Sequence, residues 1–211
     1  AIEIDNNLLR AKLLLGWTYL DVNDLDKAKD IFTSIHKQAQ ELGDTTGIGL
    51  SPIGMIHQAQ GNYDKALDYY TRSQLINQGE LDNLVIGSVY MCKGNYIKAL
   101  EYANRAVKNQ IEIGEIFGLG ISFHIIGFVH WRKGELDTAL DNWNNSLDLL
   151  ENEGGWSFFP LSDIGIYYFD KGNYDKAIEY LEKSISIQRN LENKEIRIQT
   201  ITYLALSYKK I

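Results

Sequence analysis

The four histidines are the side chains best suited to metal binding or proton transfer, yet their spacing favours neither. They are His36, His57, His124 and His130. His124 and His130 are six positions apart, which places them on different faces of a helix. No His-Glu-x-x-His or Cys-x-x-Cys pattern occurs, and the single cysteine is Cys92. We therefore expect no metal site and no cofactor.

The carboxylates also lack the arrangement of a catalytic pair. They recur at fixed positions of a repeated phrase, as in Asp64, Asp68, Glu101, Asp137, Asp141, Asp175 and Glu179. This recurrence indicates a solvated helix face. Two Gly-x-Gly segments, 47–49 and 118–120, match half of a dinucleotide fingerprint, but neither follows a strand or has the third glycine. We do not expect an enzyme.

One ten-residue phrase is repeated along the chain. It reads GNYDKALDYY at 61–70, GNYIKALEYA at 94–103, GELDTALDNW at 134–143 and GNYDKAIEYL at 172–181, with a looser copy, NDLDKAKDIF, at 23–32. A second phrase lies just upstream and places a small residue three positions before a tyrosine or histidine. Its small residues are Gly16, Gly54, Gly87, Gly127 and Gly165, and Ala205 begins a sixth copy. The regular period between these residues predicts an array of similar structural units.

Each repeat is predicted to be a pair of helices, because apolar residues recur at helical spacing on both sides of the turn that begins the phrase. First helices are expected at 5–21, 46–60, 80–93, 115–133, 156–171 and 194–209. Second helices are expected at 25–42, 63–78, 96–113, 136–152 and 174–191. Glycine in the turn supplies the positive φ of a helix end. Pro160 fits a first turn, whereas Pro52 either begins a late helix or kinks it.

Small residues predict close crossings between the paired helices. Each of the five glycines is followed by an alanine within the next copy of the ten-residue phrase, and a bulky side chain follows one helical turn later in four of the copies. The alanines are Ala28, Ala66, Ala99, Ala139 and Ala177, and the bulky residues are Phe32, Tyr70, Trp143 and Leu181.

The pattern resembles the tetratricopeptide repeat, whose signature includes Leu-Gly-x-x-Tyr, then Ala-x-x-x-Phe, then Pro. The resemblance covers about residues 5–210. The closing proline is missing from every copy. Most periods exceed the usual length of about 34 residues, which is similar to the longer-period repeats of signalling proteins, at about 38–40 residues. The resemblance implies an all-α, right-handed α-solenoid in a single domain, 1–211. The repeats would span about 5–42, 46–78, 80–113, 115–152 and 156–191, with a capping helix at 194–209. The cap's apolar set is Ile198, Ile201, Leu204 and Ala205.

The resemblance also places the first helices along a concave groove. Carried over from the small-residue positions, the groove residues would be Leu13, Trp17, Met55, Met91, His124, Phe128, Trp131, Phe159, Ile166 and Phe169. This set is apolar and aromatic, and it lacks the basic residues and asparagines with which some relatives hold peptides. The function implied is a scaffold or adaptor that binds a peptide or helix of a partner protein. Alternatives are a peptide-sensing arm of a larger signalling protein and a groove filled by a second copy of the chain.

Composition narrows the partners further. The net charge of −7 and the pI of about 5.1 disfavour nucleic acid. The charge-free stretch 116–131 is shorter than the roughly 20 residues needed to span a membrane. The first residues show no secretory signal, and the single cysteine is typical of a reducing compartment. We therefore expect a cytoplasmic protein without a membrane or nucleic-acid partner.

Overall fold

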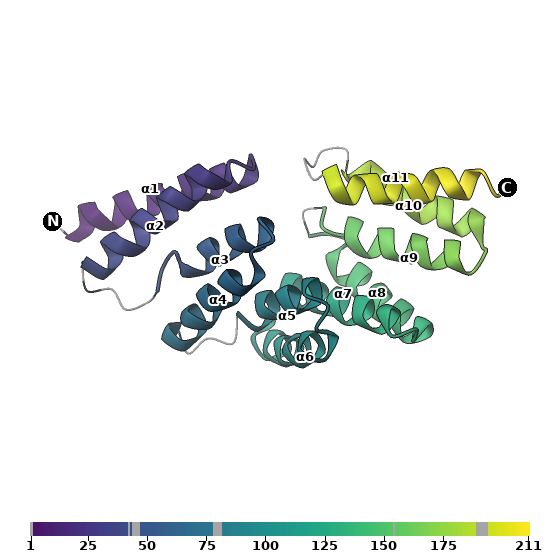
Figure 1. Ribbon diagram of the computed structural model, residues 1–211, viewed down its shortest axis with the longest axis horizontal. Helices are drawn as coiled ribbons and strands as arrows, with labels where there is room; N and C mark the ends of the chain where they lie inside the picture. The colour runs from purple at the N-terminus through teal and green to yellow at the C-terminus, as the bar shows by residue number, and fades with distance from the viewer. Residues whose placement is uncertain (1, 42, 44–46, 78–81, 154, 189–193) are drawn as a thin grey trace. The chain divides into compact units, whose positions relative to one another are not determined.

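The computed structural model describes residues 2–41, 43, 47–77, 82–153, 155–188 and 194–211, and these residues form eleven helices and no strands (Figure 1). The all-α prediction is confirmed. The helices are α1 (Ile2–Asp21), α2 (Leu25–Glu41), α3 (Leu50–Ala59), α4 (Tyr63–Asn77), α5 (Asp82–Cys92), α6 (Tyr96–Ile113), α7 (Ile116–Arg132), α8 (Leu136–Leu150), α9 (Phe158–Asp170), α10 (Tyr174–Gln188) and α11 (Lys194–Tyr208). Several of the predicted repeat boundaries, such as 42, 46, 78, 80 and 191, lie outside the described residues.

The chain forms two compact units, Ala1–Asn95 and Tyr96–Ile211. In the first unit α1 packs against α2, α2 against α3, α3 against α4, and α4 against α5. In the second unit α6 to α10 do the same, α7 also contacts α9, and α11 packs on both α9 and α10. This neighbour-to-neighbour packing is typical of a repeat array. The single solenoid domain stays a prediction.

The turn inside each repeat has the conformation that the glycines predict. Gly61 has φ 73°. Its N–H donates to the carbonyl of Gln58, and the Asn62 N–H donates to the carbonyl of His57. These two bonds satisfy orphan carbonyls at the end of α3. In the looser first copy Asn23 takes the glycine's place with φ 57°. Asparagine tolerates this conformation better than most residues.

The helix expected at 46–60 begins later, at Leu50. Gly49 precedes it with φ 91°, and a Cβ at Gly49 would lie 2.7 Å from the Phe32 carbonyl oxygen. The segment before Leu50 is therefore a turn fitted against α2. Pro52 and Pro160 are each the third residue of their helices, where the missing N–H has no helical partner to lose. The helix at Leu50 therefore starts late and is not kinked by Pro52.

Four of the five predicted close crossings are present, at Gly16, Gly54, Gly127 and Gly165. A Cβ added to Gly127 would lie 2.6 Å from the ring of Trp143, and one added to Gly165 would lie 2.6 Å from Leu181 Cγ. Gly16 and Gly54 face Phe32 and Tyr70 in the same way. The alanines of the repeated phrase, Ala28, Ala66, Ala99, Ala139 and Ala177, are all fully buried. In these repeats the first helix therefore packs so closely against its second helix that the glycine position has no room for a Cβ.

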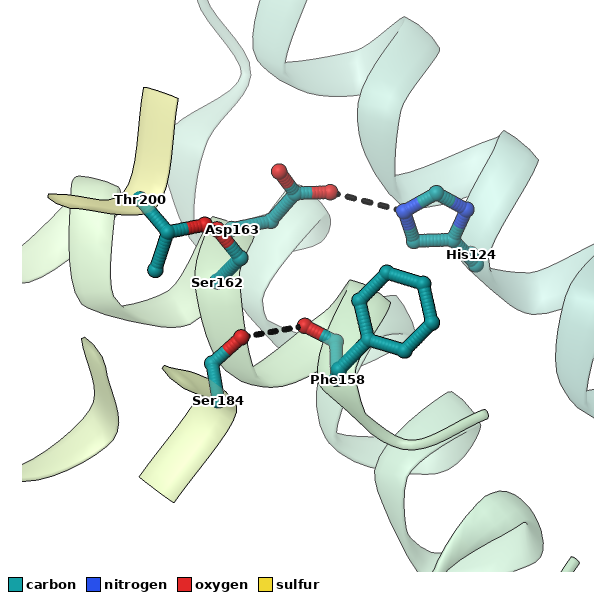
Figure 2. Close-up of polar contacts among 6 residues, drawn as sticks. All are labelled: His124, Phe158, Ser162, Asp163, Ser184 and Thr200. Atoms are coloured by element: carbon teal, nitrogen blue, oxygen red, sulfur yellow. Dashed lines mark hydrogen bonds and ion pairs between the residues drawn. The ribbon is translucent and has the colours of Figure 1, made fainter. Parts of the chain in front are cut away.

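The helix α11 covers α9 and α10 with both polar and apolar side chains, the apolar ones being Tyr203 and Leu204. Thr200 is fully buried, and its Oγ1 lies 2.9 Å from Ser162 Oγ on α9 (Figure 2). Gln188 Nε2 on α10 donates to Thr200 Oγ1 at 3.3 Å. Most of the apolar set expected to face inward does not do so, because Ile198 is 63% exposed and Ile201 is 44% exposed.

Candidate functional site

In the first unit two of the four predicted groove residues are well exposed. Trp17 on α1 and Met55 on α3 are each 39% exposed, and each directly follows the small residue of its repeat. The Trp17 indole rests edge-on against the Phe32 ring, with centroids 5.4 Å apart. Leu13 is partly buried against the core around Phe32, and Met91 is half-buried. The first unit therefore exposes part of an indole and a thioether at matching repeat positions.

In the second unit five predicted residues remain partly exposed on two helices. His124, Phe128 and Trp131 lie on α7, and Phe159 and Phe169 lie on α9. The sixth, Ile166, is different, because it is only 3% exposed and packs with Ala177 and Leu181. Ile166 is thus a core residue and takes no part in a surface.

A run of ring contacts joins α7 to the turn before α9. The His124 ring lies 5.4 Å from Phe159, Phe159 stacks on Trp156 at 5.9 Å, and Trp156 meets Phe117 edge-on at 5.3 Å. Trp156 is 45% exposed and was missed by sequence reasoning, which placed it at the start of the helix expected at 156–171 and carried over only the groove positions of the repeat. Its signal was a tryptophan placed immediately before the first turn of α9.

Trp131 connects the surface with the core. Its ring lies 5.7 Å from Phe128 on one side and 6.4 Å from the buried Trp143 on the other. Burial raises the pKa of the nearby Asp170 carboxyl, and a hydrogen bond from the Trp131 side chain partly offsets that rise. Trp131 is therefore both a surface ring and a structural one.

His124 Nε2 lies 2.8 Å from Asp163 Oδ2, and this contact joins α7 to α9 (Figure 2). The two side chains are 13% and 22% exposed. In the described part of the chain no group of three or more His, Cys, Asp or Glu side chains could hold a metal ion. The pair therefore supplies a polar contact at the edge of an aromatic surface.

His57 packs as the repeat pattern predicts, whereas His130 makes a polar contact. His57 is 4% exposed and its ring stacks on Tyr69 at 5.4 Å. Burial lowers the pKa of His57, and the neighbouring Lys29 and Lys65 lower it further. His130 contacts the Glu135 carboxylate.

The repeated carboxylates lie on a solvated helix face. Glu101 pairs with Arg105, and Glu179 with Lys183, each at 2.7 Å and one helical turn apart. All four side chains are about half exposed, between 50% and 57%. Exposed pairs of this kind contribute little to stability, and their regular spacing matches a solvated face.

Among the described residues no helix is both long and apolar enough to cross a lipid bilayer. The charge-free stretch 116–131 lies instead in α7, which packs against α6, α8 and α9. Gly118 and Gly120, half of a dinucleotide fingerprint, are buried inside the same helix. Gly120 meets Leu150 rather than open space, so no phosphate cradle forms there.

The fold is shared with known repeat proteins. A chain of the APC/C hetero-tetramer Cut9-Hcn1 superposes with a TM-score of 0.73 at 22% identity, over 96% of this chain. This chain spans only 40% of that one. A thermophilic TPR protein of Thermus thermophilus superposes with a TM-score of 0.73 at 16% identity. The match covers 93% of this chain and 99% of the Thermus protein. The apo form of the quorum sensor NprR from B. thuringiensis superposes with a TM-score of 0.70 at 17% identity. The match covers 96% of this chain and 59% of that one.

The sequence itself matches two family models, while no curated protein matches it. Both models are described as tetratricopeptide repeat, one over residues 118–190 and the other over residues 50–83. The matched segments contain the turn at Gly61 and the close crossings at Gly54, Gly127 and Gly165. The chain belongs to the tetratricopeptide repeat family.

Proposed function

We propose that the chain is a protein-interaction module, a scaffold or adaptor, that binds a peptide or helix of a partner through apolar side chains of its first helices. The family supports the general part, because stacked helical repeats present extended surfaces for binding. The specific part rests on one observation, the partly exposed rings of the second unit. We call them the aromatic surface: His124, Phe128, Trp131, Trp156, Phe159 and Phe169.

Rings on rigid helices make effective anchors. Each aromatic side chain has few rotamers to freeze on binding and offers a large contact area. The contacts among His124, Phe159 and Trp156 hold these rings in place before a ligand arrives. An apolar peptide side chain would therefore bind without reorganising the helices, and the His124–Asp163 pair would offer it a hydrogen-bonding neighbour.

The first unit supports the same function more modestly. Trp17 and Met55 occupy the same repeat position as Phe128. Each of these two side chains is 39% exposed. Methionine adapts its shape to different partners because its side chain is unbranched and flexible. We propose that these two residues contact a partner as well.

The test begins with peptides selected from a displayed random library for binding to the whole chain. Phe128→Ala combined with Phe159→Ala should weaken a selected peptide by at least about tenfold, since each truncation removes an anchor. Trp131 is left intact because its ring also contacts Trp143. Circular dichroism melting of each variant shows whether the fold is retained.

The matched control reverses charges on a second helix. Asp141→Lys combined with Asp148→Lys changes two exposed residues of α8 and should leave peptide affinity within about twofold. Raising the salt concentration should have little effect on an apolar contact. Peptides that tolerate the aromatic double variant but are lost with the charge reversals would move the site to the second helices. Light scattering that shows a dimer broken by the aromatic variant would indicate that a second copy occupies the surface.

A further inference from the structure

Two carboxylates of α9 contact α7 at matching intervals. Asp163 and Asp170 are seven positions apart on α9. Asp163 Oδ2 lies 2.8 Å from His124 Nε2 (Figure 2). The carboxyl of Asp170 accepts a hydrogen bond from the Trp131 side chain. His124 and Trp131 are likewise seven positions apart, and both belong to the aromatic surface, so this surface is bordered by two carboxylates.

Neither carboxylate is neutralised by a lysine or an arginine. Among the side chains that the structure describes, Asp163 forms an ion pair only with His124, and Asp170 forms none. His124 carries a charge only when its ring is protonated. Burial raises the pKa of the Asp170 carboxyl, and only the hydrogen bond from Trp131 opposes that rise. A cation brought by a ligand would therefore stabilise the charged form of either carboxylate.

The basic residues at the ends of these two helices have other partners. Arg132, the last residue of α7, donates from Nε to the Tyr96 hydroxyl at 3.0 Å. The Lys171 ammonium, directly after α9, lies over the Tyr167 ring at 5.5 Å from its centroid. Arg132 is also the only Asp, Glu, Lys or Arg residue within α7. Charge complementarity therefore favours a basic partner, which the net charge of −7 would also attract from a distance.

We infer that Asp163 and Asp170 receive lysine or arginine side chains of the peptide that binds the aromatic surface, an inference that rests on the proposed function. Long basic side chains suit this border, because their alkyl stems pack on apolar groups while the charged head reaches a polar one. Each carboxylate has two oxygens and can accept donors beside its contact with α7. Figure 2 shows the second oxygen of Asp163 directed away from His124. A purely apolar peptide would instead desolvate both carboxylates without giving them a partner.

The separation of the two carboxylates sets the spacing of the basic residues in the peptide. Seven residues of α-helix rise by about 10 Å. Three residues of an extended peptide span about 10 Å as well. Basic side chains three positions apart in an extended peptide, or seven apart in a helical one, would therefore reach both carboxylates. Once the peptide covers them, these charge pairs are screened by salt less than exposed pairs, so binding should still depend only weakly on salt.

The test uses the whole chain and the peptides selected from the random library. The selected sequences should carry lysine or arginine at one of the two spacings. Asp163→Asn combined with Asp170→Asn should weaken their binding by at least about tenfold, because asparagine keeps the shape of the side chain but removes the charge. Replacing the basic residues of the peptide by glutamine should cost a similar factor with the unmodified chain and little more with the asparagine variant. This non-additivity requires contact between the two sets of side chains.

The matched control is Asp141→Asn combined with Asp148→Asn on α8. These exposed carboxylates are also seven positions apart, and their loss changes the net charge by the same amount. The control should leave affinity within about twofold. Asp170→Asn alone, at an exposed position, should weaken binding by at least about threefold and provides the test if circular dichroism shows that the double variant loses its fold. Equal losses in the control and the test variants, additive losses in the cycle, or selected peptides without basic residues would each refute the inference.

The aromatic double variant, Phe128→Ala with Phe159→Ala, separates this inference from the proposed function. Peptides that are lost with the aromatic variant but bind the asparagine variants normally would refute the inference and leave the proposed function intact. The opposite pattern would contradict apolar anchoring and support the carboxylates as the receptors of the peptide.

Discussion

Gly127→Ala tests whether the helix crossings are as full as the geometry indicates. The added Cβ would lie 2.6 Å from Cδ1 and Nε1 of Trp143 and 3.1 Å from the carbonyl oxygen of Ala139. Heavy atoms in contact stay about 3.5–4.0 Å apart, so the ring must move by roughly 1 Å. Trp143 is 1% exposed and has no free volume into which it could move.

Two opposing effects determine the free energy of unfolding. Overpacking a dense crossing costs about 1–3 kcal/mol, whereas replacing glycine by alanine inside a helix gains about 1 kcal/mol. We expect a net destabilisation of about 1 kcal/mol, because the clash involves a rigid ring and a backbone atom. Trp143→Ala removes the ring and alone costs about 3–5 kcal/mol. In that background Gly127→Ala should instead stabilise the protein by less than about 1 kcal/mol, because the ring clash is gone and the 3.1 Å contact with the Ala139 carbonyl oxygen offsets only part of the helix gain.

The assay is urea unfolding followed by far-ultraviolet circular dichroism for the four proteins of this cycle. The sign reversal corresponds to a coupling energy of up to about 2 kcal/mol between the two positions. Because repeat arrays do not always unfold in one step, the slopes of the four transitions must agree before midpoints are converted to free energies. If Gly127→Ala shifts the midpoint in the same direction in both backgrounds, the crossing is not limited by the indole and our reasoning fails.

Two further changes test the register and a buried ring. Ala139→Leu should destabilise the protein by about 1–3 kcal/mol, whereas Asp141→Leu two positions on should cost under roughly 0.5 kcal/mol, and equal melting shifts would refute the assigned faces of α8. His57 has a lowered pKa in the folded state, so the unfolded chain binds the proton more readily and stability falls as the pH drops through the ordinary histidine range. His57→Tyr should flatten this fall between about pH 7 and 5, measured as the difference between the two unfolding curves, and parallel curves would contradict the assignment.

The helices and turns were predictable because their determinants are local. The glycine at each turn and the apolar spacing on either side lie within one repeat, so the bounds of α6 match the expectation fully. The start of α3 was not predictable, because apolar residues continue back to Ile48 and resemble more helix. The helix begins only at Leu50 because Gly49 approaches α2 closely, and no local sequence pattern contains that contact.

The candidate site was predictable only as a set of positions. Phe128 and Ile166 both directly follow the small residue of their repeats, yet one is half-buried and the other 3% exposed. The difference comes from the neighbouring helix, because Tyr203 and Leu204 of α11 pack against the cluster that contains Ile166. Repeat position specifies the helix face on which a side chain lies. The exposure of that side chain depends on which residues of the neighbouring helix pack against it.

This distinction explains how one phrase can build a fold and leave room for recognition. The glycine of the upstream phrase is constrained, because any Cβ there meets a side chain of the second helix at under 3.0 Å in four of the repeats. The residue immediately after it differs in every copy: Trp17, Met55, Ser88, Phe128 and Ile166. Where no further helix covers it, as at Trp17, Met55 and Phe128, this position accepts an indole, a thioether or a phenyl ring, whereas Ile166 is packed into the core. Of the side chains that we propose to bind a partner, Trp17, Met55 and Phe128 therefore lie at a position that the fold constrains less than the neighbouring glycine.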